Sequence, residues 1–287
     1  MKAKKYAFLI APAHHVKNKY ISNAKYAASV LGLKLKFKKS IKNKYLYYAG
    51  TPERRAKEIE YAFLDKNVEV ILSAVGGNGT LEVLPYIDFE IIKNNPKTII
   101  GFSDITILLN SIYQRTNLIV VHGPNQTRSW KHLSLNEINS IKNCINKQNF
   151  GFKFHKKDVR FLKFGAVHGV TAGGCLSLLV DSLKTPFEIE CKDKILFLED
   201  TDVLGRRLYT LLVQLYLSGK LTEAKLVVLG SFYNCEYGIE YVLAFFNKYR
   251  IPYIHLDKFG HGYRNFAFPI GAKCVVDTEK CNISFIF

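Results

Sequence analysis

Short apolar runs alternate with amphipathic stretches along the first 124 residues of the chain. The apolar runs predict strands, and stretches with apolar residues three and four positions apart predict helices. The expected strands are 6–10, 34–38, 68–74 and 98–101, and the expected helices are 20–31, 52–64 and 105–113. Thr51 and Pro52 provide the cap and the first residue of the second helix. This alternation is typical of an α/β domain with a mostly parallel sheet.

Residues 125–160 are polar and rich in Lys and Asn, with one short helix predicted at 136–146. This shift in composition predicts a segment that connects two domains. Beyond it we expect strands at 161–170, 195–198 and 226–229, helices at 176–183, 206–217 and 239–246, and strand-rich sequence from residue 254. The predicted fold class is therefore α/β, with a Rossmann- or flavodoxin-like parallel-sheet domain over 1–124 and a smaller, β-rich α+β domain over 161–287.

Composition narrows the class of protein. The chain has 287 residues, of which 48% are hydrophobic and 23% charged, as in a folded globular protein. The net charge of +17 is compatible with an anionic partner, but only 9 of the 41 basic residues are Arg, the side chain that reads nucleic acid best. We therefore expect no nucleic-acid partner.

The six cysteines form no CxxC pair and the eight histidines no metal-binding spacing, so no metal site is expected. The first ten residues contain an apolar stretch of five, which is too short for a signal peptide. No apolar run approaches the length of a membrane span. The expected location is the cytoplasm, with reduced thiols.

A serine follows the fourth predicted strand. Ser103 lies between the strand 98–101 and the helix expected from Ile105, so that its hydroxyl would lie at a helix N-terminus above the sheet. This arrangement is that of a nucleophile elbow without the usual second glycine. The backbone N–H of Asp104 and the helix dipole could then stabilise an oxyanion. Serine is also a common helix cap, so both interpretations stay open.

A glycine-rich loop, Gly76-Gly77-Asn78-Gly79-Thr80, follows the third predicted strand. Its bare N–H groups could approach an oxyanion or a phosphate. The loop lacks the Gly-Lys-Ser/Thr ending of a Walker loop. It resembles the GGxGT loop of the diacylglycerol and NAD kinases, in which an Asp stands at the position of Asn78. A nucleotide-binding kinase and a simple tight turn are therefore alternatives.

Two further groups could carry chemistry. Glu199 and Asp200 end a predicted buried strand, where a carboxylate needs a specific partner. His261 stands between two glycines near the C-terminus, as a mobile base would. Ser103, Glu199 and His261 could thus form a triad, although spacing alone does not show that they meet.

Several motifs together resemble the LD-carboxypeptidase (muramoyl-tetrapeptide carboxypeptidase) family of serine peptidases. They occur in family order from about residue 6 to the end, and they are Gly76-Gly77, Leu84-Pro85-Tyr86-Ile87-Asp88, Gly101-Phe102-Ser103-Asp104-Ile105-Thr106, His122-Gly123-Pro124, Gly173-Gly174, Leu196-Phe197-Leu198-Glu199-Asp200 and Gly260-His261-Gly262.

The resemblance implies a role for each candidate residue. Ser103 would be the nucleophile, His261 the general base and Glu199 the carboxylate that orients it, with the N–H groups of Gly77 and Asp104 as the oxyanion hole. The implied reaction removes the terminal D-alanine from a murein tetrapeptide during cytoplasmic recycling of wall fragments. The resemblance implies no metal or organic cofactor, and it implies a homodimer.

Substrate recognition departs from the family pattern. Val75 stands where many carboxypeptidase members have an Arg before the glycine pair, and the acidic, proline-containing stretch after the catalytic Glu is replaced by residues 201–205. Asn78 and Arg207 are our candidates for substrate binding. The related microcin C self-immunity peptidases, which cleave an aminoacyl-adenylate analogue, also lack that Arg, and Trp130 could offer their adenine a stacking platform. A noncatalytic binder of wall fragments is a further alternative.

Overall fold

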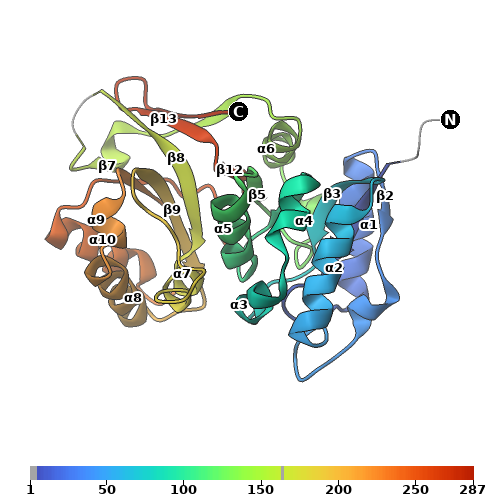
Figure 1. The fold of residues 1–287 in the computed structure, drawn as a ribbon. Helices are drawn as coiled ribbons and strands as arrows, with labels where there is room; N and C mark the ends of the chain where they lie inside the picture. Colours follow the sequence, from blue (N-terminus) through green and yellow to red (C-terminus); the bar gives the residue numbers. More distant parts are fainter. Residues whose placement is uncertain (1–4, 163–164) are drawn as a thin grey trace.

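Two β-sheets, each flanked by helices, lie beside each other in the computed structural model, which describes residues 5–162 and 165–287 (Figure 1). The first sheet has the strand order β12-β5-β4-β3-β1-β2. Its parallel strands are β1 (Tyr6–Ile10), β2 (Lys34–Lys36), β3 (Val68–Ser73), β4 (Thr98–Gly101) and β5 (Val120–His122). The edge strand β12 (Phe268–Ile270) comes from near the C-terminus and pairs antiparallel with β5.

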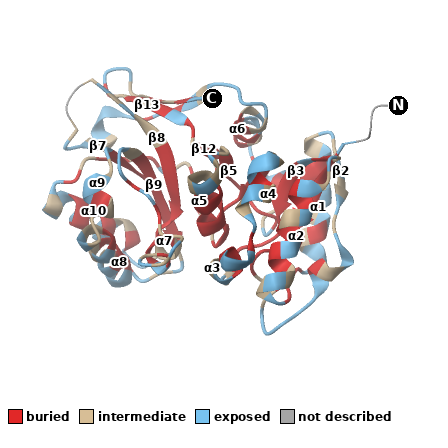
Figure 2. Ribbon diagram, viewed as in Figure 1, coloured by how far each residue is buried: buried red, intermediate tan, exposed pale blue. Residues whose placement is uncertain are grey.

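Helices cover both faces of the first sheet. They are α1 (Asn18–Val30), α2 (Pro52–Leu64), α3 (Thr80–Val83), α4 (Phe89–Asn94), α5 (Ile105–Thr116) and α6 (Leu135–Ile145). Because side chains alternate along a strand, Phe8 of β1 packs in the cluster that includes α2 and α5, whereas Leu9 packs in the cluster that includes α1 and α6. Figure 2 shows the result, since the strands β1, β3, β4 and β5 are largely buried, whereas the edge strand β2 and the outer sides of the helices are exposed.

The second sheet has the strand order β6-β14-β13-β8-β9-β10-β11-β7. Its strands are β6 (Phe150–Lys153), β7 (Val159–Arg160), β8 (Ala166–Cys175), β9 (Lys194–Thr201), β10 (Leu226–Tyr233), β11 (Tyr253–His255), β13 (Lys273–Asp277) and β14 (Asn282–Ile286). The central strands β8, β9, β10 and β11 are parallel. One face carries α7 (Leu176–Asp181), α8 (Gly205–Leu217), α9 (Lys220–Glu223) and α10 (Gly238–Tyr249).

The other face of the second sheet packs against the first half of the molecule. Phe197 of β9 stacks on Phe268 of β12, with ring centroids 4.5 Å apart. Phe259 meets Phe268 edge-on and Phe197 at a tilt, and all three belong to one buried cluster that also contains residues of α2 and α5. The two halves therefore share a continuous hydrophobic core. No helix in the described part of the chain has the length and apolar character that a membrane crossing requires.

The α/β fold class is confirmed, and strands 6–10 and 98–101 and helix 52–64 have the predicted bounds. Thr51 caps that helix by accepting a hydrogen bond from the Arg54 N–H at 3.4 Å. The other predicted elements of the first half differ by a few residues at their ends, and β5, α3 and α4 have no counterpart in the prediction. Each of these three has six residues or fewer, too few to show a clear period.

Three differences concern the second half. The strand expected at 161–170 is β8, which begins at Ala166, and positions 163–164 lie outside the described residues. The segment 125–160, expected to connect the halves, includes α6 together with β6 and β7, which pair with strands of the second sheet. The C-terminal stretch in turn lends β12 to the first sheet, so the chain crosses between the halves more than once.

Candidate active site

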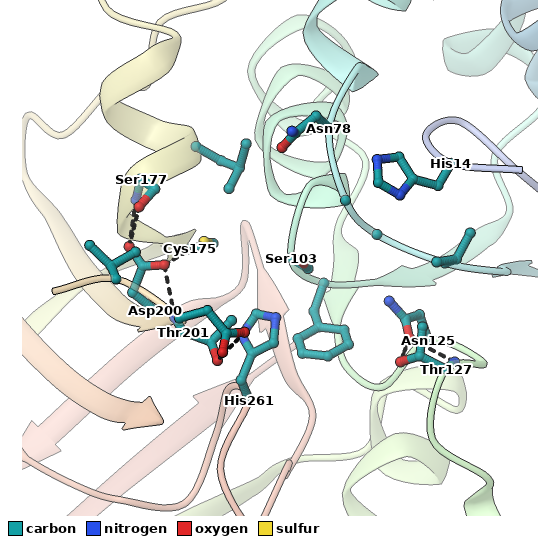
Figure 3. A pocket seen from close by; sticks show the side chains of 17 residues that line it. His14, Asn78, Ser103, Asn125, Thr127, Cys175, Ser177, Asp200, Thr201 and His261 are labelled. Atoms are coloured by element: carbon teal, nitrogen blue, oxygen red, sulfur yellow. Dashed lines mark hydrogen bonds between the residues drawn. The ribbon is translucent and has the colours of Figure 1, made fainter. Parts of the chain in front are cut away.

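A cavity of about 440 Å³ opens between the two halves, at the carboxyl ends of β3, β4 and β9 (Figure 3). Its walls include Ser103, His261 and the glycine loop from Gly76 to Asn78. Ser103 and the glycine loop come from the first half of the chain, and His261 comes from the second. The structure thus places Ser103, His261 and the glycine loop around one space.

Ser103 has an unusual backbone conformation. Its φ is 62°, in the left-handed region that residues other than glycine seldom adopt. The turn joins β4 to α5 and leaves the side chain partly exposed at the cavity. The glycine loop passes directly over it, because a Cβ on Gly76 would lie 2.7 Å from the Ser103 Oγ. Backbone strain at a residue that faces a cavity is typical of a nucleophile elbow.

Asp104 ties the serine turn to the glycine loop. Its buried carboxylate accepts hydrogen bonds from the Thr80 N–H at 2.9 Å and from the Thr80 hydroxyl at 2.5 Å. Burial raises the pKa of this carboxyl to about 6, against the lowering effect of the two hydrogen bonds. The carboxylate therefore fixes the loop, while the backbone N–H of the same residue belongs to the turn at Ser103.

Arg55 fixes the glycine loop by hydrogen bonds to backbone carbonyls. Its side chain is fully buried, and one guanidinium nitrogen donates to the carbonyls of Pro12 at 2.7 Å and Gly79 at 2.8 Å. Gly77 and Gly79 both have a φ near 108°, a conformation that glycine adopts without strain. The ring of His14 lies against Gly77, so the loop is confined on both sides.

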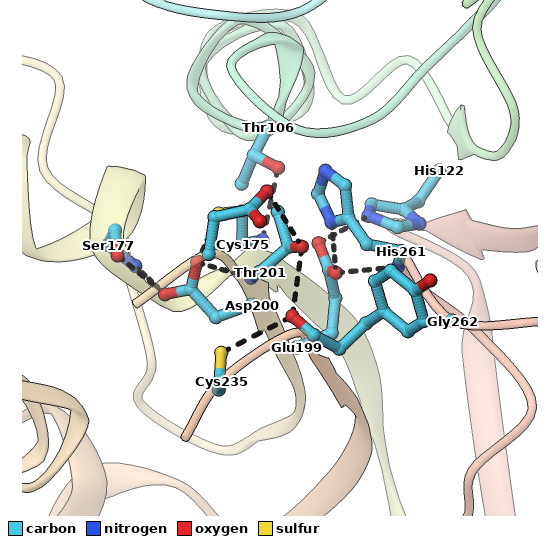
Figure 4. Close-up of polar contacts among 12 residues, drawn as sticks. Thr106, His122, Cys175, Ser177, Glu199, Asp200, Thr201, Cys235, His261 and Gly262 are labelled. Carbon is cyan, nitrogen blue, oxygen red and sulfur yellow. Dashed lines mark hydrogen bonds and ion pairs between the residues drawn. The ribbon is translucent and has the colours of Figure 1, made fainter. Parts of the chain in front are cut away.

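The His261 imidazole is paired with Glu199 (Figure 4). Nδ1 of His261 lies 2.7 Å from Oε2 of Glu199, and the His261 backbone N–H donates to the same oxygen at 3.1 Å. Gly260 makes this approach feasible, because a Cβ there would lie 2.5 Å from that oxygen. The pairing directs Nε2 of the ring away from the carboxylate.

Charge within this pair shifts both pKa values. Burial raises the pKa of the Glu199 carboxyl, but the charge of His261 and the polar contacts of two imidazoles outweigh it and lower the pKa to about 2. Burial lowers the pKa of His261, but the Glu199 carboxylate outweighs this effect and moves the pKa above its ordinary value of 6.5. Glu199 is therefore ionised at neutral pH, and its charge makes the His261 imidazole more basic than a free one.

The neighbouring acid, Asp200, binds the start of α7. Asp200 accepts hydrogen bonds from the Ser177 N–H at 2.8 Å and the Ser177 hydroxyl at 2.5 Å, and from the Thr201 N–H at 2.9 Å. These contacts fasten the first turn of α7 to the end of β9. Of the two adjacent carboxylates, only Glu199 contacts a histidine.

Side chains of α5 lock the serine turn to the second sheet. The amide of Asn110 donates to the Gly173 carbonyl at 2.9 Å and accepts from the Gly173 N–H at 3.1 Å, and Thr106 accepts from the Cys175 N–H at 3.1 Å. In the parallel pairing of β8 and β9, Cys175 is the partner of Glu199. A short run of contacts therefore relates the position of Ser103 to that of Glu199.

Two residues singled out from the sequence lie elsewhere. Arg207 is exposed on α8 and is absent from the residues that line the cavity, because helix α8 directs it toward solvent. Trp130 is fully buried in the core beneath α1, so it offers no stacking platform. Asn78 does line the cavity.

Two further histidines lie at or near the cavity. His14 lines it and was not selected from the sequence, because no motif surrounds it. The buried His122 lies behind Glu199, and although it stands within a family motif, no role was assigned to it from the sequence. No Lys or Arg occurs among the described lining residues, whereas Asp200 and Asp202 do. No cluster of three or more His, Cys, Asp or Glu suited to a metal ion occurs in the described ranges.

Comparison with known proteins matches both halves of the chain. Residues 8–123 match the LD-carboxypeptidase N-terminal domain, and residues 168–276 match the LD-carboxypeptidase C-terminal domain. A Bacillus subtilis protein named a probable murein peptide carboxypeptidase is 34% identical over 288 residues, which cover 95% of this chain and 88% of the relative. The Escherichia coli microcin C7 self-immunity protein MccF is 27% identical over 273 residues, which cover 83% and 79%.

Solved structures share the same fold. A muramoyltetrapeptide carboxypeptidase from Oxalobacter formigenes superposes with a TM-score of 0.85 at 22% identity, covering 98% of each chain. MccF in complex with aspartyl sulfamoyl adenosine superposes with a TM-score of 0.84 at 22% identity, covering 100% of this chain and 97% of the other. A muramoyltetrapeptide carboxypeptidase and a microcin self-immunity protein are thus built on this fold.

Proposed function

The chain belongs to the LD-carboxypeptidase family and is a peptidase, and from that premise we propose that it removes the terminal D-alanine from a murein tetrapeptide. The bond cut would be the one between the L-configured centre of the diamino acid and D-alanine. Ser103, His261 and Glu199 would act as a Ser-His-Glu triad. The cytoplasmic location, the role in wall recycling and the homodimer belong to the same proposal.

The observation that carries the proposal is the contact of 2.7 Å between His261 and the buried Glu199, because His261 lines the same cavity as the strained Ser103. With Nδ1 engaged by the carboxylate, Nε2 is left to accept the Ser103 proton as the hydroxyl attacks the scissile carbonyl. The carboxylate then balances the positive charge that develops on the imidazole. Such a base gives its proton to the departing D-alanine nitrogen, and water resolves the acyl-enzyme by the same route.

The backbone N–H groups of Gly77 and Asp104 would hold the oxyanion. Neither N–H has an acceptor among the hydrogen bonds of the described loops and turns, so both remain able to donate. Loss of one such donor typically costs about 10²- to 10³-fold in rate. Asn78, at the edge of the same loop, is the amide that we assign to the substrate's terminal carboxylate, because Arg207 lies outside the cavity.

Two features favour a peptide over a nucleotide. The single Trp is buried, and no Tyr or Trp is present among the described lining residues to stack on a base. The relative with the higher identity and coverage carries the name of a murein peptide carboxypeptidase. Cleavage of an aminoacyl-adenylate analogue is the second candidate, because Val75 leaves the family's usual Arg missing. The peptidase assignment leaves the kinase interpretation of the glycine loop without support.

Mass spectrometry of two parallel reactions tests the choice of substrate. A murein tetrapeptide and an aminoacyl-sulfamoyl adenylate are each incubated with wild-type protein and with Ser103→Ala. We expect the tetrapeptide to lose the mass of one D-alanine with wild type only. Cleavage of the adenylate alone would transfer the chain to the second candidate. Turnover of neither substrate, or equal turnover by Ser103→Ala, would refute the triad proposal.

A further inference from the structure

The two oxygens of the Glu199 carboxylate have unequal surroundings. Oε2 accepts both hydrogen bonds from His261. Oε1 is buried and has no hydrogen-bond partner within the described residues. Nε2 of His122 lies 3.8 Å from Oε1, and both side chains have no exposed surface. A buried carboxylate oxygen without a hydrogen-bond partner destabilises the folded state, so we expect a hydrogen-bond donor to Oε1.

His122 is the matching half of this pair. Neither of its ring nitrogens has a hydrogen-bond partner within the described residues. The ring is held in place, since it stacks on Phe268 with a centroid distance of 4.6 Å and meets Phe102 edge-on at 6.0 Å. Gly174 gives it room on the side of the second sheet, where a Cβ would lie 3.2 Å from the imidazole. Stacking thus directs the ring edge at Glu199.

The position of His122 in the fold gives this contact a function. His122 ends β5 and is paired in register with Gly101 of β4, two residues before Ser103. Glu199 belongs to β9 of the other sheet. The contact between them therefore crosses from the strands that carry the nucleophile to the strand that carries the triad carboxylate.

We propose that His122 is a positioning residue, which donates Nε2–H to the Oε1 oxygen and fixes the Glu199 carboxylate for His261. The proposal rests on the triad proposed above. The 3.8 Å separation exceeds a normal hydrogen bond, so the proposal requires the two side chains to move closer together in the complex with substrate. His122 touches neither substrate nor Ser103 and acts through Glu199.

The contact between His122 and Glu199 predicts the direction in which the pKa of His261 changes when His122 is replaced. Glu199, Asp200 and Asp202 all raise the pKa of His261, while burial lowers it. Removing the His122 donor leaves more of the Glu199 charge to act on His261. The pKa of His261 then rises, and the acidic limb of kcat/KM, which requires neutral imidazole, moves to higher pH.

Two substitutions separate a donor from a packing role. His122→Phe keeps an aromatic ring between Phe102 and Phe268 but has no nitrogen, whereas His122→Gln places an amide N–H near the position of Nε2. We expect His122→Phe to lower kcat about tenfold or more and to move the acidic limb upward. His122→Gln should keep the limb in place and kcat within about threefold of wild type. Equal behaviour of the two variants, or an unmoved limb in His122→Phe, would overturn the proposal.

Nuclear magnetic resonance supplies a readout that needs no substrate. The imidazole ¹⁵N signals of His261, assigned by their loss in His261→Ala, are titrated in wild type, His122→Phe and His122→Gln. An upward shift in His122→Phe alone supports the proposal, and the same midpoint in all three refutes it. If the wild type cleaves no peptide, the proposed function fails while this titration still tests His122. If His122→Phe does not fold, His122→Asn, whose shorter amide does not reach Oε1, takes its place.

Discussion

At the scale of single residues, the site depends on close approaches that only certain side chains permit. Ser103 adopts a left-handed backbone, Gly76 passes within van der Waals distance of it, and Gly260 lets Glu199 reach His261. The motifs could indicate these residues because each combines glycines with a reactive side chain in a short stretch. His14 could not be found in this way, since the fold alone brings it to Gly77.

Gly76→Ala tests the close packing of the loop on the nucleophile. The added methyl group would lie 2.7 Å from Cβ and Oγ of Ser103, so the serine turn has to shift. Displacing a nucleophile by about 1 Å costs on the order of 100-fold in kcat. Steady-state kinetics should show this loss, with a smaller loss in Gly123→Ala, where the nearest atom is 3.1 Å away on Ala267. Similar rates for Gly76→Ala and wild type would contradict the geometry.

Glu199→Gln tests the charge of the pair. The carboxylate raises the pKa of His261, and burial, which lowers it, would dominate once the charge is gone. The acidic limb of kcat/KM should therefore move to lower pH, opposite to the shift expected for His122→Phe, while kcat falls by about 10²- to 10⁴-fold because the imidazole loses its orientation. A pH–rate profile measures both effects. An unchanged limb would mean that Glu199 does not set the basicity of His261.

At the scale of elements, α5 begins directly after the Ser103 turn, and β8 pairs with β9, the strand that contains Glu199. Sequence patterns predicted both α5 and β8, but ended the strand at residue 170, before Gly173 and Gly174. The structure places them inside β8, where a Cβ on Gly173 would lie 2.0 Å from the Phe197 carbonyl oxygen. Glycine is needed there because the two strands approach each other closely. From the sequence alone, a glycine pair that allows close strand packing looks the same as a glycine pair in a turn. The contact of Asn110 with Gly173 joins segments that are far apart in the sequence, so no local sequence pattern predicts it.

Asn110→Leu tests this connection. The substitution leaves the buried N–H and C=O of Gly173 without their side-chain partner, at a cost of about 2–4 kcal/mol in the free energy of unfolding. The loss of alignment between α5 and β8 should also lower kcat. Gln114→Leu is the matched control. Gln114 lies one turn farther along α5, and its amide makes an equivalent pair of hydrogen bonds, with the backbone of Glu188 and of Glu190. Urea unfolding and kcat are measured for both, and an equal fall in kcat would contradict a specific role for Asn110.

At the scale of the whole molecule, a continuous core joins two sheets that each provide part of the site. The change in composition predicts two halves, but it does not predict that β12 joins the first sheet, because a strand of three residues gives no indication of the strand it pairs with. The net charge of +17 also acts at this scale. The basic side chains that produce this charge lie outside the described lining of the cavity, which has no Lys or Arg. They therefore attract anions toward the protein without binding them in the cavity.

Salt dependence tests this role of the charge. The long-range field of a basic protein accelerates the encounter with an anionic wall peptide, and salt screens the field over about 10 Å at 0.1 M. Raising NaCl from about 20 to about 300 mM should therefore lower kcat/KM several-fold. The value of kcat at saturation should stay nearly constant. A kcat/KM independent of salt would indicate that the basic surface serves another purpose.

The measurement that tests the triad most directly is D-alanine release from a murein tetrapeptide by Ser103→Ala, His261→Ala and the double variant. Residues that act as one unit are not additive, so each single variant should lose about 10⁴- to 10⁶-fold in kcat and the double variant no more than that. This result is what the geometry of Ser103, His261 and Glu199 predicts. Losses that multiply in the double variant, or a single variant that keeps a tenth or more of wild-type activity, would show that the two residues do not act together.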